Sequence, residues 1–308
     1  MRAQSRDGCG NMKVRIGYAL GTQGLRDPSR LGAVARDLDR LRFDSLWLSD
    51  RLTGAAPDPL IGLAVAAGQT RRLKLGTSVL VLPGRNPIVV AKQVASLDRL
   101  SDGRLLVAVG LGASDAREHR AFGIESRERG AWVEEVVPLL RRLWTEERVD
   151  HDGPRFHYRG LTVLPRPVQH PIDVWLGGLA PAALRRIGRV GDGWLPSFCT
   201  VAEAVQGRTI VCEAAEAADR RIDPEHFGAM LVYALRPPGR AVLEALAARR
   251  PDVEASLLVP VGLAAIRERL QEFVNAGISK LVLRPADEPD DWTSEVEALA
   301  PLVRELQT

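Results

Sequence analysis

Two consecutive glycines, Gly177 and Gly178, end an apolar run that is typical of a β-strand, and a helix is predicted to begin near Pro181. A helix N-terminus offers free amide groups and the positive end of the helix dipole, and glycines let an anion approach the backbone closely. The glycine pair therefore predicts a phosphate-binding turn, with a plain tight turn as the alternative.

A carboxylate, Asp50, follows a second predicted strand and precedes Arg51. Because side chains alternate along a strand, we expect Asp50 on the same face as Leu46 and Leu48. If the sheet closes into a barrel, this face predicts a carboxylate at the inner rim, where barrel enzymes place their chemistry. The alternative is that Asp50 caps the next helix or pairs with Arg51.

Motifs of several other enzyme classes are missing from the sequence. Gly110-Leu111-Gly112 does not continue into GxGxxG, and there is no GxxxxGK[ST] or GxSxG. The five histidines show neither HxH nor HExxH spacing, so no metal site is predicted. These absences disfavour a Rossmann enzyme, a P-loop enzyme and a metal-dependent barrel hydrolase.

The elements that must position these residues alternate along the chain. Eight short β-rich runs lie at 14–18, 45–48, 73–82, 105–109, 173–176, 193–195, 229–235 and 280–283, with helical periodicity between them. Repeated strand–helix units imply right-handed crossovers and a parallel sheet. Eight units predict an α/β fold, a single TIM-like (β/α)8 barrel.

Two segments depart from this rhythm. Residues 145–171 contain short β-runs followed by Pro165, Pro167 and Pro171, and predict a hairpin or irregular insertion between the fourth helix and the fifth strand. Residues 1–11 are expected to be a disordered N-terminal extension, which leaves 12–308 as the barrel domain.

Composition excludes several partners. Forty-two Lys and Arg against 39 Asp and Glu give a net charge of +3, too balanced for a nucleic-acid-binding protein. The Arg-Arg pairs at 71–72, 141–142, 185–186, 220–221 and 249–250 are interpreted as mostly solvated helix faces. No apolar run reaches the roughly 18–20 residues of a membrane helix, so no membrane partner is expected. Three cysteines without a CxxC favour a cytoplasmic protein.

An ordered series of short motifs carries a family resemblance. It comprises Leu46-Trp47-Leu48-Ser49-Asp50, Leu75-Gly76-Thr77-Ser78-Val79, the stretch 86–104 from Asn-Pro to Ser-Asp-Gly-Arg, Gly110-Leu111-Gly112, Glu128-Arg129-Gly130, Leu143-Trp144, Trp175-Leu176-Gly177-Gly178 and Gly191-Asp192-Gly193-Trp194. In this order, over about residues 12–285, the motifs resemble the bacterial luciferase-like superfamily.

The resemblance implies a TIM-like barrel that binds FMN or the deazaflavin coenzyme F420, and the Trp-x-Ser-Asp motif is similar to that of the F420-dependent oxidoreductases. By position, Asp50 would face the deazaflavin ring, Ser78 and Val79 would form a bulge with a non-prolyl cis peptide behind it, Leu111 and Gly112 would contact the cofactor, and Gly177 and Gly178 would hold its phosphate. Relatives are often homodimers.

Two positions depart from the sugar-phosphate dehydrogenases of this branch. Those enzymes carry Asp-His at the second strand and Glu after GxG, as acid and base, where this chain has Arg51 and Ala113. Sugar-phosphate dehydrogenation is therefore not expected. Arg51 is a candidate catalytic residue that could orient an anionic substrate or the cofactor tail, with an outward surface position as the alternative.

The resulting hypothesis is an oxidoreductase that transfers a hydride between F420 and an unidentified small organic substrate. The first alternative is an FMN-dependent luciferase-like monooxygenase, because both cofactors would use the same phosphate turn. The second is a non-catalytic flavin- or deazaflavin-binding barrel, which the missing acid–base pair would suit.

Overall fold

The computed structural model describes residues 12–21, 25, 27–113 and 115–308, so the predicted extension 1–11 lies outside the described residues. Its main sheet is formed by β1 (Arg15–Ala19), β2 (Ser45–Leu48), β3 (Lys74–Thr77), β4 (Leu80–Val81), β5 (Leu105–Gly110), β8 (Val174–Leu176), β9 (Gly193–Trp194), β10 (Gly228–Tyr233) and β11 (Lys280–Pro285). Short β3 and β4 share one barrel position, because the predicted run 73–82 is interrupted at Ser78 and Val79.

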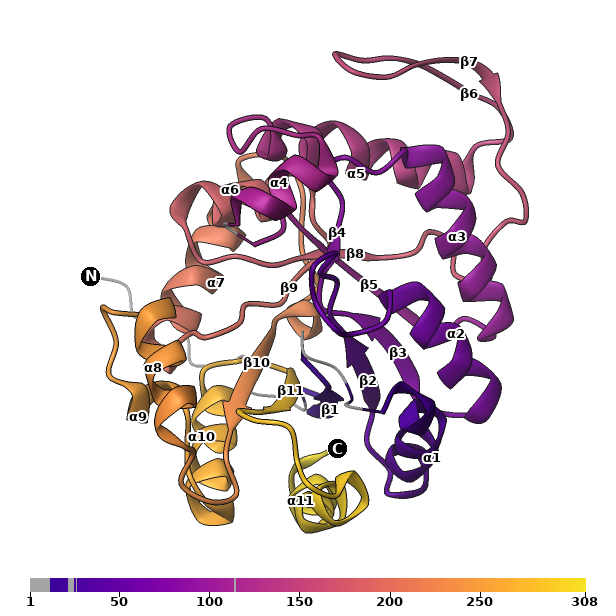
Figure 1. Ribbon diagram of the computed structural model, residues 1–308. Coiled ribbons are helices and arrows are strands. Elements are labelled where there is room, and N and C mark those ends of the chain that lie inside the picture. The colour runs from indigo at the N-terminus through magenta and orange to yellow at the C-terminus, as the bar shows by residue number, and fades with distance from the viewer. Residues whose placement is uncertain (1–11, 22–24, 26, 114) are drawn as a thin grey trace.

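Helices surround these strands, as Figure 1 shows. The outer layer consists of α1 (Leu31–Arg40), α2 (Pro59–Gln69), α3 (Pro87–Leu100), α5 (Arg129–Thr145), α6 (Pro181–Val190), α7 (Val201–Glu216), α10 (Leu263–Asn275) and α11 (Trp292–Leu306). Shorter helices lie in the connections: α4 (Ala116–Phe122), α8 (Arg240–Arg249), α9 (Ala255–Leu258) and the 3-10 turns η1 (Pro28–Arg30) and η2 (Pro224–His226).

The sheet closes on itself. Neighbouring strands are parallel in the order β10-β11-β1-β2-β3-β5-β8-β9, and β4 pairs with β5. The two ends of this series meet through parallel bridges between Trp194 and Phe227 and between Ser197 and Met230. The predicted (β/α)8 barrel is confirmed.

The predicted insertion is an antiparallel hairpin. Strands β6 (Val149–Asp152) and β7 (His157–Leu161) pair between α5 and β8, and the hairpin projects beyond the ring of helices (Figure 1). Trp132 of α5 and Phe156, in the turn between β6 and β7, pack edge to face at 5.1 Å between ring centres, which holds the turn of the hairpin against the helix.

Tryptophans fill the barrel interior opposite glycines. A Cβ at Gly76 would lie 2.2 Å from the ring of Trp47, and a Cβ at Gly193 would lie 2.5 Å from the ring of Trp175. The interior cluster takes residues from around the barrel: Ala19, Trp47, Ala108, Trp175, Leu195, Met230 and Val282. The missing glycine side chains are therefore what allows two indoles to pack inside one narrow barrel.

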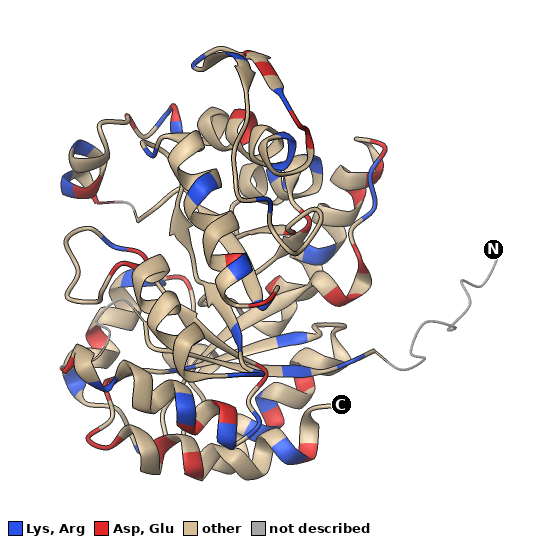
Figure 2. Ribbon diagram, turned by 90° about the vertical axis from the view of Figure 1, so that its right-hand side faces the viewer, with Lys and Arg blue, Asp and Glu red and all other residues tan. Residues whose placement is uncertain are grey.

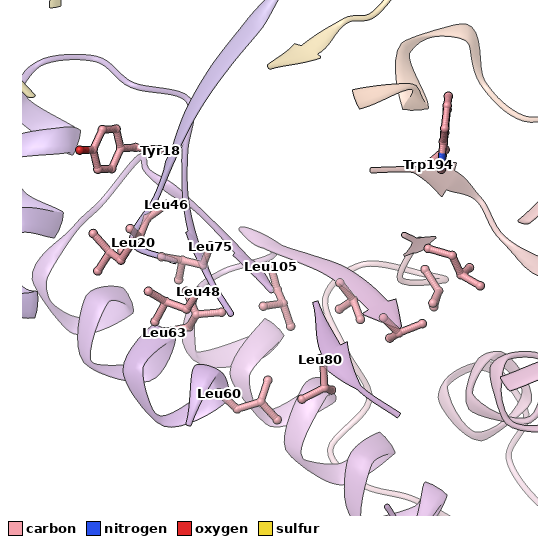
Figure 3. Packing of buried hydrophobic residues seen from close by; sticks show 14 of the residues in the cluster. Tyr18, Leu20, Leu46, Leu48, Leu60, Leu63, Leu75, Leu80, Leu105 and Trp194 are labelled. Carbon is pink, nitrogen blue, oxygen red and sulfur yellow. The ribbon is translucent and has the colours of Figure 1, made fainter. Parts of the chain in front are cut away.

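The leucines of β2 face the helices instead of the interior. Figure 3 shows Leu46 and Leu48 beside Leu63, in the layer between the sheet and α2. A Cβ at Gly62 of α2 would lie 2.6 Å from Leu48, which confirms the contact. Our prediction that Leu46 and Leu48 line the barrel interior was therefore wrong, since Trp47 is the β2 residue that points inward.

A buried ion pair closes the N-terminal end of the barrel. Lys280 Nζ lies 2.5 Å from the Asp44 carboxylate, and Arg15 and Lys74 lie within 4 Å of the same carboxylate. Burial alone would raise the Asp44 pKa, but the charges of Lys280 and Lys74 hold it below its ordinary value. Cations at this end thus have a counter-charge.

Most other charged side chains lie on helices and loops, and few lie along the strands (Figure 2). Some arginine pairs that we interpreted as solvated faces make internal ion pairs, as Arg141 and Arg220 both do with Asp192 at 2.7 and 3.0 Å. Across the described ranges, no helix has the length and apolar character that crossing a membrane requires.

Candidate active site

The C-terminal ends of β2 and β3 are joined at the interruption between Ser78 and Val79. The peptide bond between these two residues is cis, as the resemblance implied. The Ser78 amide donates to the carbonyl of Leu48 at 2.7 Å, and the Asp50 amide donates to the carbonyl of Val79 at 3.3 Å. The Ser49 hydroxyl also donates to the Ser78 carbonyl at 3.0 Å. Together these bonds fix the bulge to the end of β2.

Val79 is the point at which three strand ends meet. A Cβ at Gly110, at the end of β5, would lie 2.4 Å from Val79, and a Cβ at Gly177, after β8, would lie 3.5 Å from it. The Gly177 amide donates to the Val109 carbonyl at 3.3 Å, which aligns these two ends. The structure therefore brings the bulge, the Gly110–Gly112 turn and the Gly177–Gly178 turn together at one end of the barrel.

Asp50 lies at this end of the barrel, but alternation from Leu46 and Leu48 does not explain its position, because those leucines face the helices. It follows the end of β2, and its Oδ2 accepts hydrogen bonds from the Val81 amide at 2.9 Å and from Arg85 Nη2 at 2.8 Å. Its side chain is only 4% exposed. Burial raises the Asp50 pKa above its ordinary value, and the charge of Arg85 offsets that increase only in part.

The turn after β5 is held by Arg129 from the first turn of α5. Arg129 Nη1 donates to the carbonyls of Leu111, at 2.8 Å, and Ala113, at 3.3 Å. The φ of Gly112 is +85°, so this turn requires a glycine. Arg129 is buried and has no acidic partner among the described residues, and burial lowers its pKa. Its charge therefore remains available to the turn.

The turn after β8 requires glycine and leads directly into helix α6. The Gly178 carbonyl accepts from the indole of buried Trp194 at 2.9 Å, and the Gly178 φ of +120° is one that side chains rarely adopt. A Cβ there would lie 2.9 Å from that of Ala183. Helix α6 begins at Pro181, and its N-cap residue, Ala180, provides no side-chain hydrogen bond. Pro181 has no amide N–H and the Ala183 amide donates to the Ala180 carbonyl at 2.8 Å, which leaves the Ala182 amide as the candidate anion donor of this turn.

Arg51 is occupied by acidic residues of the α4 region. Its Nη2 lies 3.1 Å from Asp115, and its Nε lies 3.9 Å from Glu118. Glu118 in turn accepts from the amide of Thr53 at 2.8 Å, which fixes the loop after β2. The Arg51 charge is thus largely compensated, and the side chain lies neither free at the surface nor unpaired in the mouth of the barrel.

The two positions at which sugar-phosphate dehydrogenases carry their acid and base, 51 and 113, hold neither a histidine nor a carboxylate in this chain. Arg51 is paired as described, and Ala113 offers only its carbonyl, which accepts from Arg129 and lies 2.8 Å from His119 Nε2. Within the described ranges, no group of His, Cys, Asp and Glu is arranged to hold a metal ion.

Sequence reasoning missed Arg85 as the partner of Asp50 and Arg129 as the support of the Leu111 turn. Arg129 stands in the quoted Glu-Arg-Gly motif, and Arg85 directly precedes the Asn86 cap of α3. Arg129 was visible within a motif and Arg85 lies just before one, but only the fold shows that their guanidinium groups reach back to strand ends.

Comparisons with known proteins agree with this geometry. Residues 12–277 match the family described as luciferase-like monooxygenase. A protein of Kineococcus radiotolerans named F420-dependent glucose-6-phosphate dehydrogenase is 34% identical over 192 residues, which span 59% of this chain and 56% of that protein. A protein of the same name from Nakamurella multipartita is 28% identical over 300 residues, covering 92% and 86%.

The fold is also similar to that of solved structures. The chain superposes on an F420-dependent secondary alcohol dehydrogenase, solved with an F420–acetone adduct, with a TM-score of 0.82 at 18% identity. The match covers 96% of this chain and all of that one. At this identity the likeness extends to the fold alone.

Proposed function

Because the chain belongs to the luciferase-like monooxygenase family, we propose that it is an F420-dependent oxidoreductase that transfers a hydride between the deazaflavin and a small organic substrate. The observation that carries the proposal is the convergence of three strand ends on Val79, beside a buried carboxylate and the glycine turn that precedes helix α6. The names of the two relatives support the choice of cofactor.

The residues at the barrel mouth fit such a cofactor. Val79 offers an apolar side chain between two glycine turns, and the Gly178 turn that leads into α6 would hold a phosphate. When bound, the deazaflavin would supply the hydride-transfer centre at its C5. Asp50 would set the charge at the edge of the ring, and Leu111 and Gly112 would line the cofactor from the turn that Arg129 fixes.

Glucose 6-phosphate is not the proposed substrate, although relatives carry its name. The chain has Arg51 and Ala113 where an acid and a base are expected, and Arg51 is already paired with Asp115. Alcohol oxidation needs a group that accepts the hydroxyl proton, and this mouth lacks that pair. By microscopic reversibility, reduction of a carbonyl by reduced F420 needs a proton donor at the same place, so the missing pair does not fix the direction of hydride transfer.

Equilibrium titration with both cofactors tests the proposal. We expect micromolar binding of F420 and weak binding of FMN, followed by absorbance of the deazaflavin. Tight FMN binding without F420 binding would favour the monooxygenase alternative. Binding of F420 without hydride exchange across a broad acceptor panel would favour the non-catalytic barrel. Turnover of glucose 6-phosphate would overturn the assignment of substrate.

We also propose a homodimer formed through α2 and α3. Ile61 and Val65 lie one turn apart on α2 and are 67% and 48% exposed, and Val89 on neighbouring α3 is 51% exposed. Adjacent exposed aliphatic side chains are unusual on a monomer surface. Ile61→Glu should give a monomer by light scattering, while the control Val205→Glu on α7 should not; a monomeric wild type would contradict the proposal.

A cytoplasmic location is part of the same proposal. Among the described residues, Cys199 is buried and Cys212 is exposed, and neither forms a disulfide, which suits a reducing compartment. Cell fractionation with an antibody to the native protein would check it, and recovery outside the cytoplasm would contradict it.

A further inference from the structure

Two arginines share one aromatic ring on the C-terminal side of the barrel. Arg249 ends α8, Arg284 lies near the end of β11, and Phe198 follows β9. The guanidinium carbons of Arg249 and Arg284 lie 4.4 and 5.4 Å from the centre of the Phe198 ring. We call these three residues the arginine cluster. Stacking on one ring holds the two cations close together.

The arginine cluster faces the mouth. Val282 belongs to the interior cluster, and because side chains alternate along β11, Arg284 points to the same side one layer higher. A Cβ at Gly21, beyond β1, would lie 2.7 Å from Arg284 Nε, so the neighbouring strand end leaves room for the guanidinium. Arg249, which we interpreted as part of a solvated helix face, is indeed exposed at the end of α8, and its guanidinium also contacts the Phe198 ring.

Helix α8 is held in place by a small apolar cluster. Leu246 of α8 and Leu258 of α9 pack with Val232 at the end of β10, and Phe198 joins the same cluster. The neighbour of Arg249, Arg250, donates to the Phe198 carbonyl at 2.5 Å. Phe198 has a φ of +57°, a conformation that persists only where such contacts fix it. The ring that both guanidinium groups contact is thus built into the fold.

Among the described residues, the two cations have no counter-charge. No hydrogen bond or ion pair joins Arg249 or Arg284 to another residue of that part of the chain, whereas Arg250 binds Glu203 at 2.7 Å and Asp252 at 2.9 Å. Arg249 is exposed and Arg284 is half-buried. Burial, then the charge of Arg249, lowers the pKa of Arg284 to about 10. Two like charges on one ring repel each other unless an anion joins them.

We propose that the arginine cluster binds an anionic group of the substrate, a carboxylate or a phosphate. The inference rests on the proposed function, because the cluster lies at the same end of the barrel as Val79 and the Gly178 turn. Guanidinium groups present paired donors that match the oxygens of either anion. The substrate class is therefore a small organic acid or phosphate ester, and anion recognition falls to Arg249 and Arg284 instead of Arg51.

Binding of inorganic phosphate to the purified full chain tests the cluster without turnover. By titration calorimetry at constant ionic strength, Arg249→Gln should weaken phosphate binding at the cluster about tenfold, and the Arg249→Gln/Arg284→Gln double variant should remove this binding event and leave only that of the Gly178 turn. Arg240→Gln is the matched control, because Arg240 lies on the same helix, is 92% exposed and pairs with Glu244. The control should bind phosphate as the wild type does.

Thermal melting in phosphate-free buffer supplies a second readout. Arg249→Gln should melt higher than the wild type, since it removes repulsion, while Arg240→Gln should not. Acetate should compete with phosphate at the wild-type site. Equal phosphate binding by the double variant and the wild type would overturn the proposal, as would a lower melting temperature for Arg249→Gln.

Titration with F420 separates the two possible sources of the anion. Unchanged F420 affinity in the double variant assigns the cluster to the substrate. A parallel loss of F420 and phosphate binding would give the cluster to the cofactor's own anionic tail and overturn the substrate assignment. If the wild type binds phosphate but no F420, the proposed function fails and the anion site stands alone.

Discussion

At the scale of single residues, burial disfavours the ionised form of Asp50, and its hydrogen bonds and ion pair offset this effect only in part. The carboxylate is held by the Val81 amide and by Arg85, yet its pKa stays above the ordinary value because burial outweighs them. A carboxylate whose ionised form is disfavoured by its surroundings reduces the stability of the fold at neutral pH. Such a cost is typical of a functional position.

Replacement of Asp50 by Asn separates this cost from function. Asn retains an acceptor for the Val81 amide, so we expect an unchanged or higher melting temperature at pH 7 and at least about tenfold weaker F420 binding. The stability gain should appear as pH rises through the Asp50 pKa, since only the ionised carboxylate bears the burial cost.

Asp58→Asn is the matched control for that measurement. Asp58 lies 3.7 Å from the same Arg85 and caps α2, a role that Asn also fulfils. The control should change neither melting temperature nor F420 affinity. A large loss of stability in Asp50→Asn, with intact F420 binding, would make Asp50 a structural residue.

The position of Asp50 at the strand end could be read from the sequence, but its orientation could not. Alternation from Leu46 and Leu48 failed because those leucines face α2 and because Asp50 lies beyond the last paired residue of β2. Its partner, Arg85, is 35 residues away and is brought near only by the β3–β4 interruption.

At the scale of elements, the connection from β8 to α6 depends on the conformation of Gly178. Its φ of +120° and the 2.9 Å approach of a Cβ to Ala183 leave no room for a side chain. Gly178→Ala should therefore destabilise the fold by about 1–3 kcal/mol and weaken cofactor binding. Chemical denaturation and F420 titration would measure the two effects.

Replacement of Gly68 by alanine should change the free energy of unfolding in the opposite direction. Gly68 lies in α2, and a Cβ at this position would meet nothing within 4 Å. Gly68→Ala should therefore stabilise the fold by about 0.5–1 kcal/mol, because alanine loses less backbone freedom in a helix. F420 affinity should not change. Equal effects at Gly68 and Gly178 would show that the turn has no special requirement.

Elements with strong local signals were predicted well from the sequence. Prolines in the first turn correctly predicted where α3 and α6 begin, and β-rich runs predicted the barrel strands, because these signals act within a few residues. Helix α8 was not predicted: its main packing contacts are with α9 and the end of β10, which are separated in sequence. The arginine cluster could not be found without that packing.

At the scale of the whole molecule, the interior of the closed barrel is filled by tryptophan rings that pack against glycines on neighbouring strands. Gly76→Ala should cost about 1–3 kcal/mol, because its Cβ would meet the rigid Trp47 ring at 2.2 Å. Trp47→Leu should also destabilise the fold by leaving a cavity. The double variant should lose less stability than the two single losses combined, as urea denaturation would show. Strict additivity would contradict direct packing between the two residues.

The closed barrel could be predicted because eight strand–helix units leave few topologies for a parallel sheet. What fills the interior could not, since the inward face of each strand depends on register with its neighbours. Trp47 and Gly76 were each seen as part of a motif, but nothing in the motifs shows that one packs against the other.

The unbalanced charge of Arg249 and Arg284 also bears on how such a protein changes under selection. If removing either arginine stabilises the fold, mutation alone would erase the cluster quickly in any lineage that no longer needs it. Its presence in this chain then records a present demand for an anion. In descendants released from that demand, the arginines at the mouth should be lost before the Asp44–Lys280 pair at the other end.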